Sequence, residues 1–291
     1  MTLRVLVTGG SGFLGGHVVP LLVSRGAAVV ALARSESAAE CVTELGATPV
    51  AGDLDDPASI DQAFADSGAD ALVNLASLGF GHAPAIVAAA EDAGIKRAVF
   101  VSTTAIFTNL NADSKEMRQG AEAVIEASAL EWTIIRPTMI YGTPRDRNMV
   151  RLLRLLKRTP FVPVPGGGHR LQQPIHVEDL AQAVVAALDT PAAIAKAYDV
   201  AGPEPLTFRQ VIEEAAEAVG RRARLVPIPL APMATSLRLY ERMAPRPRFK
   251  AEQLERLAED KAFDITAARR DLAFEPRSFA QGIRQEAAML S

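Results

Sequence analysis

Short apolar runs alternate with segments of helical spacing through the first half of the chain. The runs are rich in β-branched residues and fall at 5–7, 27–33, 48–52, 69–75, 97–102 and 132–136. Between them, apolar residues recur at the three- and four-residue intervals of a helix face, as Val18, Leu21 and Leu22 do. Parallel strands need crossover connections, so this alternation predicts an α/β fold with a doubly wound parallel sheet and helices on both faces.

The first strand runs into a glycine-rich turn that opens a helix. The turn consists of Thr8, Gly9, Gly10, Ser11, Gly12, Phe13, Leu14 and Gly15, which satisfies both G-x-G-x-x-G and T-G-x-x-G-x-x-G. Glycine permits backbone conformations and close approaches that a Cβ would prevent, and a helix N-terminus offers unpaired N–H groups to an anion. In this position the motif predicts a Rossmann fold that binds the pyrophosphate of a dinucleotide. An ordinary glycine-rich turn is the alternative.

The end of the second strand bears on the choice of cofactor. An acidic residue there holds the ribose hydroxyls of NAD, whereas an arginine accommodates the additional phosphate of NADP. This strand is followed by Arg34 and Ser35, and the acid is absent. The sequence therefore predicts NADP(H), and the alternative is a solvated arginine at a strand end.

Further candidate residues follow other strands in the same way. They are Asp53 and Leu54, then Leu75, Ala76 and Ser77, and then Ser102, Thr103 and Thr104. Ligands of such sheets bind beyond the carboxyl ends of the strands. We expect these residues to line one crevice.

The alternating pattern changes from about residue 148. A helix is predicted over 150–157, a proline- and glycine-rich loop over 160–168, a helix opening at 175–180, a strand over 197–200 and a helix over 208–219 capped by Thr207. We expect residues 1–147 to form the cofactor-binding core, to which a strand and a helix return at about 175–201. Residues 148–291 then supply a smaller α/β substrate-binding lobe that is interleaved with the core, and no reliable period is found beyond residue 221.

Composition narrows the range of partners. The net charge of −3 gives no general reason to expect nucleic acid or an anionic membrane surface, and no apolar run approaches the ~20 residues of a membrane span. Cys41 is the single cysteine, and no signal peptide precedes the first strand, so we expect a cytoplasmic protein. The expected partner is a small-molecule substrate; a homodimer is left open, and no metal-ligand spacing is found.

Together the motifs resemble the short-chain dehydrogenase/reductase superfamily, in its extended or atypical branch that includes the NAD-dependent epimerases and dehydratases. They are 8–15, Asp53-Leu54, Asn74-Leu75-Ala76, 101–104, 136–142, 175–180 and a closing helix at 264–274. The resemblance assigns Asp53 and Leu54 to the adenine and Ala76 to the lining of the cofactor cleft. It places Pro137, Thr138, Met139 and Ile140 beside the nicotinamide. The segment 171–177 is most similar to atypical members such as the NADPH-holding accessory subunit of respiratory complex I.

The chain departs from this family at the catalytic motif. The family uses Tyr-x-x-x-Lys after the fifth strand, with a Ser or Thr hydroxyl at the end of that strand. Thr104 suits the hydroxyl role, but no tyrosine lies between Thr104 and Trp132; alignment on the following residues puts Ser114 at the tyrosine position and Arg118 at the lysine position. Arginine can hold a ribose but does not titrate near neutral pH.

Three interpretations of function stay open. The first is an NADP-dependent oxidoreductase acting on a small organic or nucleotide-sugar-like substrate, with Thr104, Ser114 and Arg118 as the catalytic candidates. The second is a non-catalytic NADP(H)-binding sensor or assembly protein, and the third is an NDP-sugar epimerase or dehydratase, which the missing tyrosine disfavours. Tyr141 is expected to be a packing residue, and His176 a helix cap.

Overall fold

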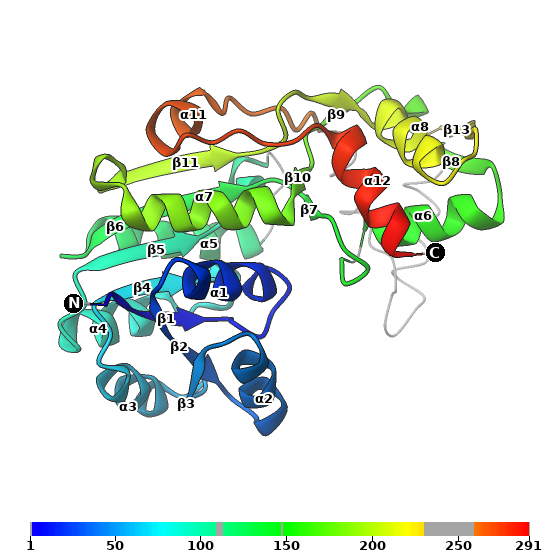
Figure 1. Cartoon of the computed structure of the whole chain (residues 1–291). Coiled ribbons are helices and arrows are strands. Elements are labelled where there is room, and N and C mark those ends of the chain that lie inside the picture. The colour runs from blue at the N-terminus through cyan, green and yellow to red at the C-terminus, as the bar shows by residue number, and fades with distance from the viewer. Residues whose placement is uncertain (1, 109–112, 147, 230–258, 291) are drawn as a thin grey trace, which may run out of the picture.

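A parallel sheet of seven strands forms the centre of the molecule (Figure 1). The computed structural model describes residues 2–108, 113–146, 148–229 and 259–290. The strands lie in the order β11-β6-β5-β4-β1-β2-β3. Their bounds are β1 (Arg4–Thr8), β2 (Ala28–Ala33), β3 (Thr48–Ala51), β4 (Ala71–Asn74), β5 (Arg97–Val101), β6 (Glu131–Pro137) and β11 (Lys196–Val200). All neighbouring pairs are parallel, so the predicted doubly wound α/β fold is confirmed.

Helices cover both faces of this sheet, and the alternation of side chains along β1 shows why. Val5 and Val7 pack into one buried cluster, whereas Leu6 packs into another, as expected when successive strand residues point to opposite faces. The first cluster includes residues of α1 (Gly15–Ser24), α2 (Glu36–Glu44), α7 (Val177–Asp189) and α11 (Thr266–Leu272). The second includes residues of α3 (Pro57–Ser67), α4 (Ala83–Asp92) and α5 (Asp113–Glu126).

A third buried cluster lies apart from the sheet, where Figure 1 shows α6, α8 and α12 gathered. It is built from α6 (Met149–Arg158), α8 (Phe208–Ala218), α12 (Phe279–Met289), β8 (Phe161–Pro165), β7 (Ile140–Tyr141) and β12 (Leu206–Thr207). The strand β8 pairs in parallel with β13 (Arg224–Ile228), β7 pairs with β10 (Ile175–His176), and β12 pairs with β9 (Leu171–Gln172). Four short 3-10 helices complete the described elements: η1 (Leu78–Phe80), η2 (Thr104–Phe107), η3 (Gly166–Gly168) and η4 (Pro191–Ala193).

The structure corrects the prediction for 160–168. This segment is not only a loop, because Phe161–Pro165 forms β8. Its partner β13 lies about sixty residues further along the chain, and a local pattern carries no sign of such a distant strand. None of the helices in the described ranges is long and apolar enough to cross a membrane.

Candidate functional site

The glycine turn between β1 and α1 is built without room for side chains. A Cβ on Gly15 would lie 2.1 Å from the carbonyl oxygen of Gly10, and Gly9 has a φ of +70°. Within the described residues, no side chain caps the N-terminus of α1, and its first turn holds no acidic residue. A pyrophosphate fits this cradle, because the positive end of the helix meets no competing carboxylate.

Thr8, the last residue of β1, connects the glycine turn to the end of β4 through hydrogen bonds. Its hydroxyl donates to Oδ1 of Asn74 at 2.6 Å, and the Asn74 amide donates to the carbonyl of Ala76 at 3.1 Å. A Cβ on Gly9 would lie only 2.9 Å from the backbone nitrogen of Ala76. These hydrogen bonds therefore join the end of β1 to the end of β4. The Thr8 side chain is fully buried between the two strand ends and does not face the cleft.

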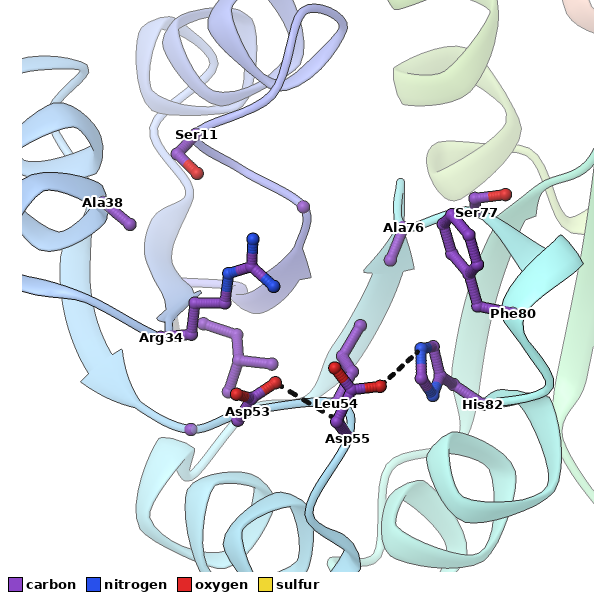
Figure 2. Close-up of a pocket in the computed structure, with 13 residues that line it drawn as sticks. Ser11, Arg34, Ala38, Asp53, Leu54, Asp55, Ala76, Ser77, Phe80 and His82 are labelled. Atoms are coloured by element: carbon purple, nitrogen blue, oxygen red, sulfur yellow. Dashed lines mark hydrogen bonds and ion pairs between the residues drawn. The ribbon is translucent and has the colours of Figure 1, made fainter. Parts of the chain in front are cut away.

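A pocket of about 560 Å³, here called the Arg34 pocket, opens at this edge of the sheet (Figure 2). Seven of the residues predicted to bind the cofactor line it: Gly9, Ser11, Arg34, Asp53, Leu54, Ala76 and Ser77. Arg34 is exposed, and Figure 2 shows its guanidinium reaching into the pocket between Ser11 and Asp53. It forms no hydrogen bond or ion pair with another described residue. Ser35 does not line the pocket, because its hydroxyl caps α2 by accepting from the amide of Ala38 at 3.3 Å.

The opposite wall of the Arg34 pocket comes from residues that the sequence reasoning missed. Phe80 is 73% exposed, and its ring lies 6.2 Å from that of His82. His82 also lies 3.6 Å from Asp55, whose amide donates to Asp53. Phe80 and His82 belong to the segment after β4, and Figure 2 shows them across from Arg34, whereas Asp53 and Asp55 follow β3. The glycines at 79 and 81 predict a loop after the fourth strand, but they do not predict which way the side chains of Phe80 and His82 point.

Two further pockets continue the crevice. The Arg118 pocket, of about 330 Å³, is lined by Arg118 and by the predicted residues Phe13, Leu14, Leu75, Ser77, Ser102, Thr103, Pro137, Thr138 and Ile140. The Phe107 pocket, of about 740 Å³, is lined by Phe107 and by the predicted residues Thr103, Thr104, Thr138 and Met139, among others. Ser77 is common to the first two pockets, and Thr103 and Thr138 to the last two. The strand ends thus form one continuous lining, as their positions in the sequence predicted.

The three catalytic candidates are not all brought together. Thr104 is 8% exposed, and its hydroxyl donates to the carbonyl of Pro137 at 3.2 Å. The guanidinium of Arg118 lies against Gly79, where an added Cβ would be 3.1 Å from Nε. Ser114 is half-buried on α5 and lines none of the three pockets. Neighbouring Lys115 donates from Nζ to the carbonyl of Thr108 at 2.6 Å.

Tyr141 and His176 are structural, as their sequence positions predicted. Tyr141 is fully buried, burial raises its pKa, and its hydroxyl donates to the carbonyl of Phe279 at 3.5 Å. His176 caps α7 by accepting the Glu178 amide at Nδ1, and burial lowers its pKa to about 4. Asp179 lies in the first turn of α7, and its buried carboxylate pairs with Arg277, with 2.8 Å between Oδ1 and Nη2.

The glycine cradle at the N-terminus of α1 lies where the strand order reverses between β1 and β4, and this defines a dinucleotide-binding Rossmann protein. Among the residues with a described placement, no group of three or more His, Cys, Asp and Glu side chains could hold a metal ion. The cofactor class therefore rests on the cradle and its strand-end lining.

Comparison with known proteins gives the family. Residues 9–191 match the sequence model of the NAD(P)H-binding family, and the chain belongs to that family. A ceramide reductase of Caulobacter vibrioides is 32% identical over 77% of this chain and 73% of its own. The 4-hydroxy-2-methyl-3-oxo-4-farnesyl-3,4-dihydroquinoline-1-oxide ketoreductase of Stigmatella aurantiaca is 28% identical over 94% of this chain and 92% of its own.

The resemblance to atypical short-chain dehydrogenases is confirmed by two other matches. The mitochondrial NADH dehydrogenase [ubiquinone] 1 alpha subcomplex subunit 9 of Dictyostelium discoideum is 26% identical over 86% of this chain and 74% of its own. The UDP-glucose 4-epimerase of Thermus thermophilus, solved with NAD, has a TM-score of 0.77, at 22% identity over 99% of this chain and 98% of that one. The epimerase likeness concerns the fold. The family match and the fold together place the chain among the NAD(P)H-binding proteins of the atypical short-chain dehydrogenase/reductase type, and its cofactor is a nicotinamide dinucleotide.

Proposed function

We propose that the protein is an NADP-dependent oxidoreductase that reduces a carbonyl group of a small organic substrate. The observation that carries this proposal is Arg34, an exposed guanidinium without a described partner at the end of β2. The 2′-phosphate of an adenosine bound in the Arg34 pocket would be the ionic partner of this guanidinium. The two reductase relatives support the reaction class.

The residues of the crevice divide the work of binding and positioning. The α1 N-terminus and Gly9–Gly15 would hold the pyrophosphate, and Asp53 and Leu54 would face the adenine. Arg118 would hold the second ribose through its guanidinium, while Pro137–Ile140 would flank the nicotinamide. NADPH would supply a hydride when bound. The Arg118 pocket, in which we propose that the nicotinamide lies, shares Thr103 and Thr138 with the Phe107 pocket, and this supports a substrate site there.

The described residues of the site include no tyrosine that would deliver a proton to the substrate as the family's catalytic tyrosine does. General acid catalysis contributes roughly 10²–10⁴-fold in rate, and Ser114 has no acidic group comparable to the missing tyrosine. Thr104 lines the wall of the Phe107 pocket, and its hydroxyl would donate to the substrate oxygen by turning its proton away from the carbonyl of Pro137. The proton then comes from water or from a hydroxyl, so turnover is slow. Substrates whose negative charge is delocalised during reduction need least help.

The cofactor assignment is tested by titrating the native protein and Arg34→Ala with NADPH and NADH. A charge-assisted hydrogen bond contributes about 1–3 kcal/mol, so the native protein prefers NADPH by roughly 5- to 150-fold and the variant loses that preference. Arg25→Ala is the matched control: it removes one arginine at the other end of α1, where Arg25 pairs with Asp189. Equal native affinities, or an unchanged ratio in Arg34→Ala, would refute the assignment.

A second candidate is a non-catalytic NADP(H)-holding protein. It is favoured by Ser114, which stands at the tyrosine position and lines none of the three pockets. The similarity to the complex I subunit is consistent with it. An NADPH-oxidation screen over aldehydes, ketones, enones and sugar nucleotides separates the two: tight NADPH binding without any turnover supports the second. An NDP-sugar epimerase or dehydratase is supported by likeness of fold alone.

We also propose a division of the chain into two parts, a cellular location and an oligomeric state. Residues 1–147, with 175–201, form the cofactor-holding part, and the rest of 148–291 forms the lobe over the substrate. A cytoplasmic location and a homodimer are proposed as well. Light scattering of the purified protein tests the dimer.

A further inference from the structure

The aromatic residues that line the Phe107 pocket indicate which kind of substrate it can bind. Phe107, in η2, and Phe263, just before α11, approach with ring centroids 6.0 Å apart and planes inclined by 36°. Both line the pocket, together with Met139. Phe107 is 48% exposed, so a large apolar surface faces the pocket beside Thr103 and Thr138. Such a surface is stabilised when an apolar ligand covers it.

The wall that carries Phe263 is anchored before any ligand arrives. The backbone nitrogen of Phe263 donates to Oε1 of Gln173 at 2.8 Å, and that of Lys261 donates to the carbonyl of Leu171 at 2.9 Å. The Leu171 amide in turn donates to Asp260 at 2.9 Å. On the opposite side, the Thr108 hydroxyl donates to Glu259 at 2.6 Å. Hydrogen bonds therefore hold the segment of Phe263 in place beside the ring of Phe107.

The charges around this pocket cancel. Its described lining holds two basic residues, Arg170 and Lys261, and two acidic residues, Glu259 and Asp260. Arg170 is 3.2 Å from the carboxylate of Asp260. A nucleoside diphosphate brings two or more negative charges and needs uncompensated cations. Glu259 and Asp260 would repel it, so the described walls do not favour a nucleotide-linked sugar.

We infer that the substrate is an uncharged carbonyl compound with an apolar chain or ring, which lies against the apolar surface that Phe107 and Phe263 form together while its carbonyl group faces Thr103, Thr104 and Thr138. This inference rests on the proposed oxidoreductase function and specifies its substrate class. The names of the ceramide reductase and of the farnesyl-quinoline ketoreductase are consistent with it.

The test is a series of methyl n-alkyl ketones that differ by one CH₂ group. Each CH₂ group that enters an apolar site raises kcat/KM about fourfold, until the chain leaves the pocket. A keto acid of the same length, ending in a carboxylate, is at least about tenfold poorer, because its charge must be desolvated. Ketone affinity for the protein–NADPH complex is measured in parallel from the fluorescence of bound NADPH, which needs no turnover.

The chain offers a matched control for the aromatic wall. Phe107 and Phe161 are similarly exposed, at 48% and 51%, and each has an arginine over its ring, at 5.4 Å and 5.6 Å. Phe161 lies on β8 and lines none of the three pockets. Phe107→Ala therefore flattens the dependence on chain length and weakens the longest ketone at least about tenfold, whereas Phe161→Ala leaves both unchanged. Phe107→Leu, which keeps an apolar side chain, recovers part of the effect.

The outcomes separate this inference from the proposed function. Turnover that does not rise with chain length, or that is best with the keto acid or a nucleotide-linked ketosugar, overturns the inference and leaves the oxidoreductase proposal intact. Ketones that bind with increasing affinity along the series, with Phe107→Ala weakening them, but are never reduced refute the oxidoreductase proposal and support the apolar site. Equal effects of Phe107→Ala and Phe161→Ala also overturn the inference.

Discussion

Glu286 offers a quantitative test of the contact between α12 and the segment that follows β7. It lies on α12 and is fully buried, and its Oε2 accepts from the amide of Gly142 at 3.0 Å. Burial, followed by interaction with the nearby carboxyl group of Asp146, raises the pKa of Glu286 from 4.5 to about 9. Oε1 of Glu286 and Oδ2 of Asp146 are both buried without a described partner. A proton held by Glu286 satisfies this pair of carboxyl groups.

The retained proton makes stability fall as pH rises. The unfolded chain releases the Glu286 proton above about pH 4.5, whereas the folded chain keeps it up to about pH 9. Each pH unit in this window therefore costs about 1.4 kcal/mol of folding free energy. Glu286→Gln supplies a neutral N–H donor to Asp146 and an oxygen to Gly142 at every pH. Relative to the native protein, the variant gains roughly 4 kcal/mol between pH 5 and pH 8.

Urea unfolding followed by circular dichroism at pH 5, 6, 7 and 8 measures this difference. Glu275→Gln removes the same charge from an exposed position three residues before the α12 cap and serves as the control. We expect the advantage of Glu286→Gln to grow with pH and that of Glu275→Gln to stay small. A difference that is constant with pH, or that shrinks as pH rises, would refute the reasoning. Asp146 also accepts from the amides that open α6, and Asn148 lines the Phe107 pocket, so the pair supports the site wall.

Two other predictions concern the crevice itself. Gly15→Ala puts a Cβ 2.1 Å from the Gly10 carbonyl oxygen and should abolish NADPH binding in a fluorescence titration; Gly16→Ala, whose added Cβ would meet its nearest neighbour at 3.6 Å, should leave binding within about twofold, and equal effects would contradict the cradle. In steady-state assays Thr104→Ala should lower kcat at least about tenfold, and Ser114→Ala should change it little. Activity that survives Thr104→Ala would show that the substrate hydrogen bond comes from elsewhere.

The sheet and the glycine cradle could be predicted because their determinants are local. A short run rich in β-branched residues and bounded by turn signals favours a buried strand from local sequence alone. The close contact of Gly15 with Gly10 likewise lies within a single turn of the chain. Strand ends also fall at one edge of a parallel sheet by geometry, so Arg34, Asp53 and Thr103 could be assigned to one crevice in advance.

The remainder depends on contacts between distant segments. The β8–β13 pair, the Arg277–Asp179 ion pair and the Phe107–Phe263 contact each join residues dozens of positions apart. Loop side chains such as Phe80 take their direction from neighbours that the local pattern does not name. Ser114 is a catalytic candidate because it aligns with the family's tyrosine, yet it lines none of the three pockets. An alignment position alone does not determine where a side chain lies.

Hydride transfer from NADPH to a carbonyl carbon is the step that the proposed function requires, and deuterium labelling detects it. The native protein is incubated with NADPH carrying deuterium at C4 of the nicotinamide, in separate reactions for each C4 face, and with the best methyl ketone of the series. Mass spectrometry of the alcohol should find one deuterium on the carbinol carbon from one face and none from the other, with Gly15→Ala as the blank. Tight NADPH binding with no deuterium in any alcohol product would contradict the assignment of this protein as a carbonyl reductase.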